Sequence, residues 1–247
     1  AAMRKVRGRE IAMIFQNPMS SLNPVWPIGD QIGEVLRLHR GMTRSDARKA
    51  AISLLRRVGI PAPETRVDHY PFQWSGGMVQ RAMIAIAMAG NPKLLLADEP
   101  TTALDVTIQD QILALLLDLQ RETGMAMILV SHDLGVIAET CDRVAVMYGG
   151  RVVELATTRE IFERPAHPYT QALLRSIPRL DAHSDRLASI QGQPPDLAGL
   201  GRGCAFAERC PEAQDICHSR ETALKAVGPD HSSACHFAER IVAGGQR

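Results

Sequence analysis

Three short apolar runs in this chain each end in polar residues, and stretches with helical periodicity separate them. The runs span residues 11–15, 93–97 and 125–130. Runs of this length suit buried strands, and strands that alternate with helices predict an α/β domain with a parallel sheet. Ligands of such sheets bind beyond the carboxyl ends of the strands. The polar residues that we expect at those ends are Gln16, Asp98, Glu99 and His132.

The remaining periodic stretches predict helices and one more strand. The expected helices span residues 28–40, 43–58, 75–89, 107–123 and 134–141. The strand is expected at 143–148, before Gly149 and Gly150. Thr43 with Asp46 three residues later forms an N-cap arrangement, and Gly59 and Gly124 are suited to end helices.

The pair Asp98-Glu99 follows the apolar run directly. A carboxylate delivered to a sheet edge in this way can hold Mg²⁺, and the next acid can orient or deprotonate an attacking water. The alternative is that two adjacent acids form a solvated turn.

Ser75, Gly76 and Gly77 stand at the start of the helix expected at 75–89. The positive end of a helix and its uncovered backbone N–H groups favour a phosphate there. The alternative is an ordinary N-cap followed by close packing of the glycines.

The order of these features along the chain resembles that of one protein family. Gln16, residues 75–77, Asp98-Glu99, residues 103–105 and His132 follow one another as the motifs of ABC-type ATPases do. The resemblance extends from about residue 3 to residue 155. It implies an α/β fold with a partial ABC-type, RecA-like ATPase core, into which a helical subdomain is inserted at about residues 17–88.

The resemblance also implies roles for the residues at the strand ends, with ATP and Mg²⁺ as cofactors. Asp98 is similar to the Walker B aspartate, and Gln16 to the glutamine that senses Mg²⁺ and the attacking water, so both are expected at the Mg²⁺. Glu99 resembles the catalytic glutamate. His132 resembles the switch histidine, which contacts the γ-phosphate.

Other residues are implied to act at a nucleotide shared between two subunits. Ser75, Gly76 and Gly77 resemble the signature segment, which closes over the nucleotide bound by the opposite subunit. Asp105 lies in the segment that the family places at the dimer interface. Met78 and Trp74 depart from the commonest signature residues, and Met at the former position is common in the peptide-importer branch.

A larger departure is that no Gly-x-x-x-x-Gly-Lys-Ser/Thr phosphate loop occurs in the 247 residues. That loop cradles the β- and γ-phosphates, and in the family it lies several tens of residues before the position of Gln16. We therefore expect a chain that begins after the loop and is incomplete. The alternative is a natural, degenerate subunit.

Two further segments resemble the branch of the family that imports dipeptides, oligopeptides and nickel. Residues 15–24 are similar to the segment around its glutamine, and residues 165–174 are similar to its C-terminal extension. We expect residues 1–155 to form the ATPase domain and residues 156–247 the extension.

Four cysteines gather in the segment 204–235. They are Cys204, Cys210, Cys217 and Cys235. Such a group is a disulfide framework or a metal site, with free thiols as the alternative, and a cytosolic setting favours the metal. The resemblance implies a [4Fe–4S] cluster, and four thiolates could also hold Zn²⁺. Nearby His218, His231 and His236 could substitute as ligands, and Cys141 is expected to be a small buried apolar residue.

Composition agrees with a protein that reaches the membrane only through partners. No apolar run approaches the roughly 20 residues that span a bilayer, and a net charge of +1 does not indicate nucleic-acid binding. By resemblance, the partners are a second ATPase subunit in a homo- or heterodimer, two transmembrane permease subunits and, indirectly, a substrate-binding protein. The expected location is the cytoplasmic face of the membrane.

The leading hypothesis is an ATP-hydrolysing subunit that energises import of peptides, nickel or other small solutes. The rival is a non-catalytic subunit that completes a partner's ATP site; Glu99 and His132 argue against it. A soluble family member acting in repair or translation is disfavoured by the extension after Pro165. The sequence leaves the transported substrate open.

Overall fold

The computed structural model describes residues 2–102, 104–176 and 190–244. The chain packs as two compact units, one ending at His132 and the other beginning at Asp133. Residue 103, expected to belong to the dimer-interface segment, lies outside the described residues. None of the helices in the described ranges is long and apolar enough to cross a bilayer.

The first unit contains the predicted parallel sheet. Its strands are β1 (Ile11–Ile14), β2 (Leu94–Asp98) and β3 (Ala126–Val130), in the order β1-β2-β3. Ile14 lies opposite Ala97, which in turn lies opposite Leu129, so the three carboxyl ends fall at one edge. Parallel pairing thereby brings together residues that are more than 100 positions apart in the chain.

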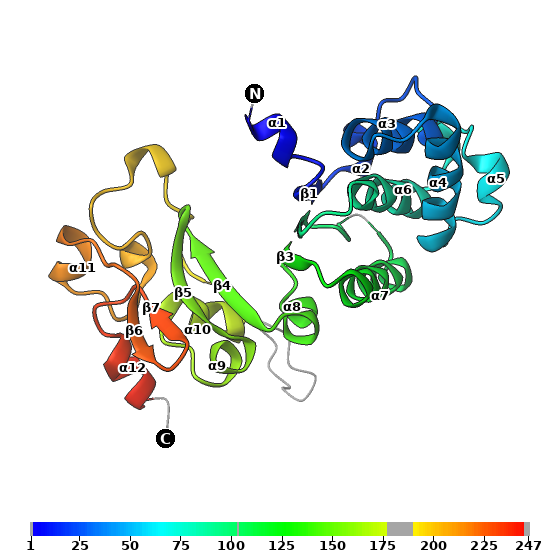
Figure 1. Ribbon diagram of the computed structural model, residues 1–247. Coiled ribbons are helices and arrows are strands. Elements are labelled where there is room, and N and C mark those ends of the chain that lie inside the picture. Colours follow the sequence, from blue (N-terminus) through cyan, green and yellow to red (C-terminus); the bar gives the residue numbers. More distant parts are fainter. Residues whose placement is uncertain (1, 103, 177–189, 245–247) are drawn as a thin grey trace. The chain divides into compact units, whose positions relative to one another are not determined.

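Among the described residues of this unit, seven α-helices and one 3-10 helix precede the strands or lie between them along the chain. They are α1 (Ala2–Val6), α2 (Pro18–Ser21), α3 (Ile28–Arg40), α4 (Arg44–Arg57), α5 (Pro63–Arg66), η1 (Pro71–Gln73), α6 (Gly76–Ala89) and α7 (Val106–Thr123). Figure 1 shows α3, α4, α5 and α6 gathered in one part of the unit. The predicted ends are confirmed, because Thr43 caps α4 through the backbone N–H of Asp46 and Gly124 ends α7 in the left-handed region.

The helices between β1 and β2 share one buried core. Ile28, Ile32 and Leu36 are fully buried and fall four residues apart, so they line one face of α3. They pack in the same cluster as Leu55 of α4 and Ile84 of α6. The side-chain amide of Gln80, buried on α6, donates to the backbone oxygen of Pro100 at 2.6 Å. This bond ties the helical core to the turn that follows β2.

The second unit is built on an antiparallel sheet. Its strands are β4 (Arg143–Tyr148), β5 (Arg151–Thr157), β6 (Lys225–Gly228) and β7 (His231–Ser233), in the order β4-β5-β7-β6. The strand at 143–148 is therefore present, but it does not extend the parallel sheet of the first unit. Gly149 and Gly150 both adopt positive φ, at 55° and 76°, and close a tight hairpin with β5.

Sequence analysis missed β5, β6 and β7. Residue 155, where the ATPase domain was expected to end, lies within β5. The division into an ATPase domain at 1–155, with a subdomain at about 17–88, and an extension at 156–247 stays a prediction.

Short helices and an aromatic cluster complete this unit. The helices are α8 (Leu134–Thr140), α9 (Thr158–Glu163), α10 (Pro168–Arg175), η2 (Leu197–Gly199), η3 (Ala207–Arg209), α11 (Asp215–Ser219) and α12 (Ala238–Gly244). The ring centroid of Tyr148 lies 4.5 Å from that of Tyr169 and 5.2 Å from that of Phe206. Cys141 is the residue that caps the C-terminal end of α8. Because it lies at the end of the helix, it is half-buried, and the expectation that it is buried is wrong.

A buried carboxylate holds the second unit together. Glu154 on β5 is fully buried and accepts hydrogen bonds from the backbone N–H groups of Ala166, at 2.6 Å, and His167, at 3.0 Å. His231 on β7 places Nε2 2.7 Å from the same carboxylate and Nδ1 3.5 Å from Glu160 on α9. One side chain thus joins two strands to the segment that enters α10.

The substitution Glu154→Ala should destabilise this unit. It leaves Nε2 of His231 and two backbone N–H groups buried without their acceptor, which costs about 3–5 kcal/mol. Native-state amide exchange of β5 and β7 measures the loss. Glu163→Ala is the control, because its pair with Arg159 is exposed and should contribute less than about 0.5 kcal/mol. Equal effects of the two substitutions would contradict the assignment.

Candidate functional site

The carboxyl edge of the parallel sheet is shaped by Glu99. This residue follows β2 directly, and its backbone N–H donates to the oxygen of Val130 at 3.0 Å. Its φ is +43°, in the left-handed region that non-glycine residues rarely adopt. Such strain persists where the surrounding structure enforces it, and it is common at functional sites. The turn points the Glu99 side chain at its neighbours.

Three side chains approach the Glu99 carboxylate. Gln16 donates from Nε2 to Oε2 at 2.6 Å, and Thr102 donates from Oγ1 to the same oxygen at 2.9 Å. His132 places Nδ1 3.1 Å from Oε1. The Glu99 side chain is 21% exposed, so the carboxylate is held on several sides and still reachable by water. The structure thus brings together Gln16, Glu99 and His132.

These contacts lower the pKa of Glu99. The contact with His132 has the largest effect, followed by the hydrogen bonds from Thr102 and Gln16, while burial acts in the opposite direction. The carboxyl group is therefore ionised at neutral pH. An ionised, partly exposed carboxylate can orient a water molecule and accept its proton late in a reaction.

Asp98 and Gln16 offer oxygen atoms beside this carboxylate. Asp98 is the last residue of β2 and is half-buried, and its side chain has no hydrogen-bond partner among the described residues. Gln16 uses its amide nitrogen on Glu99, which leaves its amide oxygen as an acceptor. Oxygen ligands of this kind are those that Mg²⁺ prefers, so the donor set fits the expected ion.

Thr102 was not anticipated from the sequence. Its backbone N–H donates to the oxygen of Glu99 at 3.1 Å, and this turn folds the hydroxyl back onto the carboxylate. The signal that could have identified it is the run from Glu99 to Thr102, in which Pro100 favours a turn.

Ser75 and Gly77 stand at the N-terminus of α6, apart from the hydrogen bonds around Glu99. Ser75 is the N-cap residue, yet its exposed side chain makes no capping hydrogen bond. A Cβ at Gly77 would approach the side chain of Ile108 on α7 to 3.0 Å. Close packing therefore accounts for Gly77, whereas the Ser75 hydroxyl is directed to solvent.

Asp105 caps the neighbouring helix. Its side chain accepts a hydrogen bond from the backbone N–H of Ile108 at 3.0 Å, which begins α7. Asp105 is exposed, and Val106 beside it is 74% exposed. An exposed apolar residue next to a cap is compatible with an interface at this helix start.

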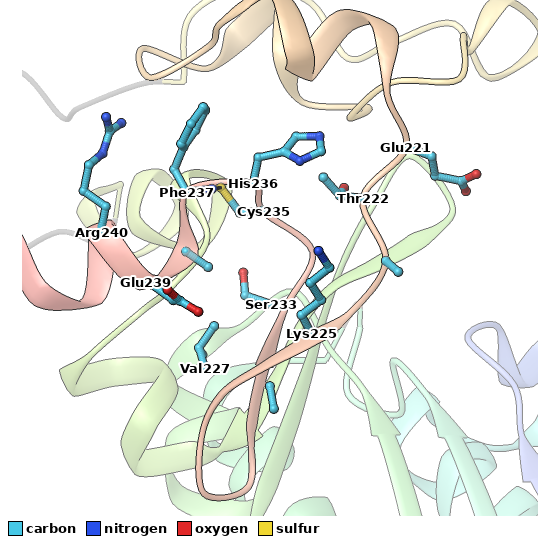
Figure 2. Close-up of a pocket in the computed structure, with 13 residues that line it drawn as sticks. Glu221, Thr222, Lys225, Val227, Ser233, Cys235, His236, Phe237, Glu239 and Arg240 are labelled. Carbon is cyan, nitrogen blue, oxygen red and sulfur yellow. Dashed lines mark hydrogen bonds between the residues drawn. The ribbon is translucent and has the colours of Figure 1, made fainter.

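The four late cysteines line one pocket in the second unit. Its other lining residues include His167, Phe206 and His236. All four are free thiols, and no three His, Cys, Asp or Glu side chains of the described residues are positioned to share a metal ion as they lie. Figure 2 shows Cys235 and His236 on the segment after β7, beside a second, open pocket lined by Lys225 and Glu239.

Burial raises the pKa of several of these thiols. The shift is upward for Cys204 and Cys210 and reaches about 11 for Cys235. Backbone N–H groups act against it, as where Phe237 donates to Cys235 Sγ at 3.4 Å. The thiols of Cys204, Cys210 and Cys235 are therefore protonated at neutral pH unless a metal ion displaces their protons.

The three histidines suggested as substitute ligands differ in their availability. His231 has a carboxylate at each ring nitrogen, so it is occupied within the Glu154 network. His236 lines the cysteine pocket and contacts the backbone oxygen of Arg220 at 3.2 Å, whereas His218 is exposed. His167, which sequence analysis did not consider as a site residue, also lines this pocket. Burial lowers its pKa to about 4.

Comparison with known proteins places these features in a family. A model described as ABC transporter matches residues 2–102, and one described as oligopeptide/dipeptide transporter, C-terminal region, matches residues 153–217. A Brucella melitensis protein whose name describes a peptide import ATP-binding protein is 54% identical over 98% of this chain and 73% of its own length. The chain belongs to the ABC transporter ATP-binding proteins.

A second relative and a solved structure show the same family resemblance. The dipeptide transport ATP-binding protein DppD of Escherichia coli K12 is 51% identical over 95% of this chain and 72% of its own length. A solved dimeric ATP-binding cassette in a post-hydrolysis state, bound to ADP and Pi, is 32% identical. It covers 64% of this chain and 67% of its own length, with a TM-score of 0.57. The α/β fold of an ABC ATPase is therefore confirmed.

The pKa of Glu99 should respond to its three neighbours. Removing the His132 contact with His132→Ala should raise the pKa of Glu99 most, and Thr102→Val should raise it less. Carboxyl NMR titration measures both. Because the folded pKa is lowered, Glu99 stabilises the fold above its unfolded pKa, and this contribution disappears as pH falls through the folded value. Glu10, whose pKa is lowered by Lys93, is the internal control and should not move.

Proposed function

We propose that this chain is an ATP-hydrolysing subunit that energises import of peptides by an ABC transporter. The observation that carries the proposal is the Glu99 carboxylate, held by Gln16, Thr102 and His132 at the edge of the parallel sheet. The names of the relatives support peptides as the transported class. A non-catalytic subunit would have no need to hold an ionised carboxylate in this way.

Each residue at the edge has a task in this hydrolysis. Glu99 orients the water that attacks the γ-phosphorus, and the bond to the bridging oxygen of ADP breaks as the new bond forms. The water proton passes to the Glu99 carboxylate and from there to solvent. Asp98 and the amide oxygen of Gln16 would hold Mg²⁺, which would neutralise charge on the phosphates. His132, whose side chain is 75% exposed, offers Nε2 to the γ-phosphate.

Ser75, Gly76 and Gly77 act on the nucleotide of a second subunit. The start of the 14-residue helix α6 presents backbone N–H groups and the uncommitted Ser75 hydroxyl to a phosphate. Asp105, at the start of α7, lies in the subunit interface of this proposal. ATP then binds between two ATPase subunits, identical or different, and its hydrolysis releases them.

The remaining partners follow from the family. Two transmembrane permease subunits receive the motion, so the chain works as a peripheral protein on the cytoplasmic face of the membrane. An extracytoplasmic binding protein delivers the peptide, and no nucleic acid takes part.

We further propose that the cysteine-rich segment 204–235 holds a metal, as an iron–sulfur cluster in preference to zinc. Four thiols in one pocket, with backbone N–H groups directed at sulfur, form a suitable donor set once deprotonated. Analysis of iron, sulfide and zinc in chain purified without oxygen tests this, and a preparation with neither metal would contradict it.

The substitution Ser75→Arg tests the ATPase assignment. With a relative's phosphate-loop segment joined to its N-terminus, the chain should bind Mg·ATP, dimerise and hydrolyse it. A bulky cation at the start of α6 should abolish dimerisation and lower hydrolysis by about 100-fold or more while each subunit still binds ATP. Calorimetry, light scattering and phosphate release measure the three steps.

Ser45→Arg is the matched control, because Ser45 is exposed near the start of α4. It should behave as the unsubstituted chain. Full hydrolysis by the Ser75→Arg variant would contradict the proposed role of α6. An unsubstituted chain that binds Mg·ATP without hydrolysing it would favour the non-catalytic subunit.

A further inference from the structure

His167 carries a buried donor that has no acceptor. The residue is 1% exposed, and its Nε2 has no hydrogen-bond partner in the part of the chain that the structure describes. Its Nδ1 accepts the backbone N–H of Tyr169 at 3.1 Å, so the ring proton of the neutral imidazole sits on Nε2. A buried N–H group without an acceptor costs about 1–3 kcal/mol, and such a group in a native fold calls for an explanation.

The imidazole ring of His167 cannot rotate outward to reach water. The backbone N–H of His167 donates to the buried Glu154, and Pro168 begins α10 immediately afterwards. The ring also lies against Phe206, with 6.2 Å between the ring centroids. Backbone anchor, helix cap and aromatic neighbour together fix where Nε2 lies.

His167 lines the pocket that the four cysteines line. We propose that the Nε2–H of His167 donates a hydrogen bond to a cysteine sulfur once these cysteines bind a metal, so that His167 is a positioning residue of the metal site. The inference rests on the metal site proposed above. A thiolate is a stronger acceptor than a thiol, so metal binding supplies the partner that Nε2 lacks.

The same geometry argues against His167 as a direct metal ligand. A ligating Nε2 must be unprotonated, which would move the proton to Nδ1. Nδ1 would then face the N–H of Tyr169 with two donors and no acceptor. The helix cap thus selects the tautomer that donates at Nε2, and the four ligands remain cysteines.

Two substitutions separate the two nitrogens. His167→Asn keeps an acceptor near the position of Nδ1, where Asn is a favourable N-cap, and removes the donor from the pocket. His167→Gln extends an amide N–H group toward the position of Nε2 and gives up the cap. Thr170→Val is the control, because the Thr170 hydroxyl is also buried without a partner among the described residues, and Thr170 does not line the pocket.

The probe is Co²⁺, titrated without oxygen into the full chain and followed by thiolate-to-cobalt absorption. His167→Asn should weaken Co²⁺ binding by about 10- to 100-fold, whereas His167→Gln and Thr170→Val should stay within about threefold. If His167 has only a structural role, the result should differ. His167→Gln should then lose more thermal stability than His167→Asn, and no variant should change the Co²⁺ affinity. That result would overturn the inference while leaving the metal site intact.

An unsubstituted chain that gives no thiolate absorption would overturn this inference, whereas the metal site itself is tested by the analysis of iron, sulfide and zinc. Should the variants fail to fold, nitrogen-15 NMR of the unsubstituted chain reads His167 directly. Adding Zn²⁺ should leave the proton on Nε2, shift it downfield and slow its exchange. A proton on Nδ1, or an Nε2 signal that Zn²⁺ does not alter, would overturn the inference.

Discussion

The parallel register of β1, β2 and β3 is the constraint on which the candidate site depends. It aligns three strand ends, so that residues 16, 99 and 132 meet although 83 and 33 positions separate Glu99 from its two partners. The left-handed turn at Glu99 then directs the carboxylate at its donors. A slip of one residue in any strand would place its functional side chain on another face of the sheet.

The carboxylates of Glu99 in the first unit and Glu154 in the second lie in different surroundings. Glu99 is partly exposed and its hydrogen bonds lower its pKa, which suits a group that meets water. Glu154 is fully buried, and its carboxylate oxygens contact two backbone N–H groups and His231, which suits a group that stabilises the fold. By accepting the backbone N–H of His167, Glu154 also sets the position of a buried ring donor at the cysteine pocket.

Local signals account for what the sequence predicted. The apolar runs, the cap at Thr43 and the glycine at 124 specify strands and helix ends through neighbouring residues alone, and the parallel pairing follows from their alternation. The strands of the second unit were harder to predict, because β6 and β7 are only four and three residues long. β6 pairs with β7, and β7 pairs with β5, where Glu154 lies opposite Ser233, 79 positions further along the chain. Thr102 and the Nε2 of His167 depend on tertiary contacts that no spacing reveals.

The most direct test is single-turnover ATP hydrolysis by the chain joined to a relative's phosphate-loop segment, with Glu99→Gln compared with Glu122→Gln. Gln keeps the shape of Glu99 but neither orients water as a carboxylate does nor accepts its proton. We expect Mg·ATP binding to persist and the rate to fall by about 100-fold or more. Glu122, exposed and paired with Arg57, should tolerate the change. A Glu99→Gln rate within threefold of the unsubstituted chain would contradict the account.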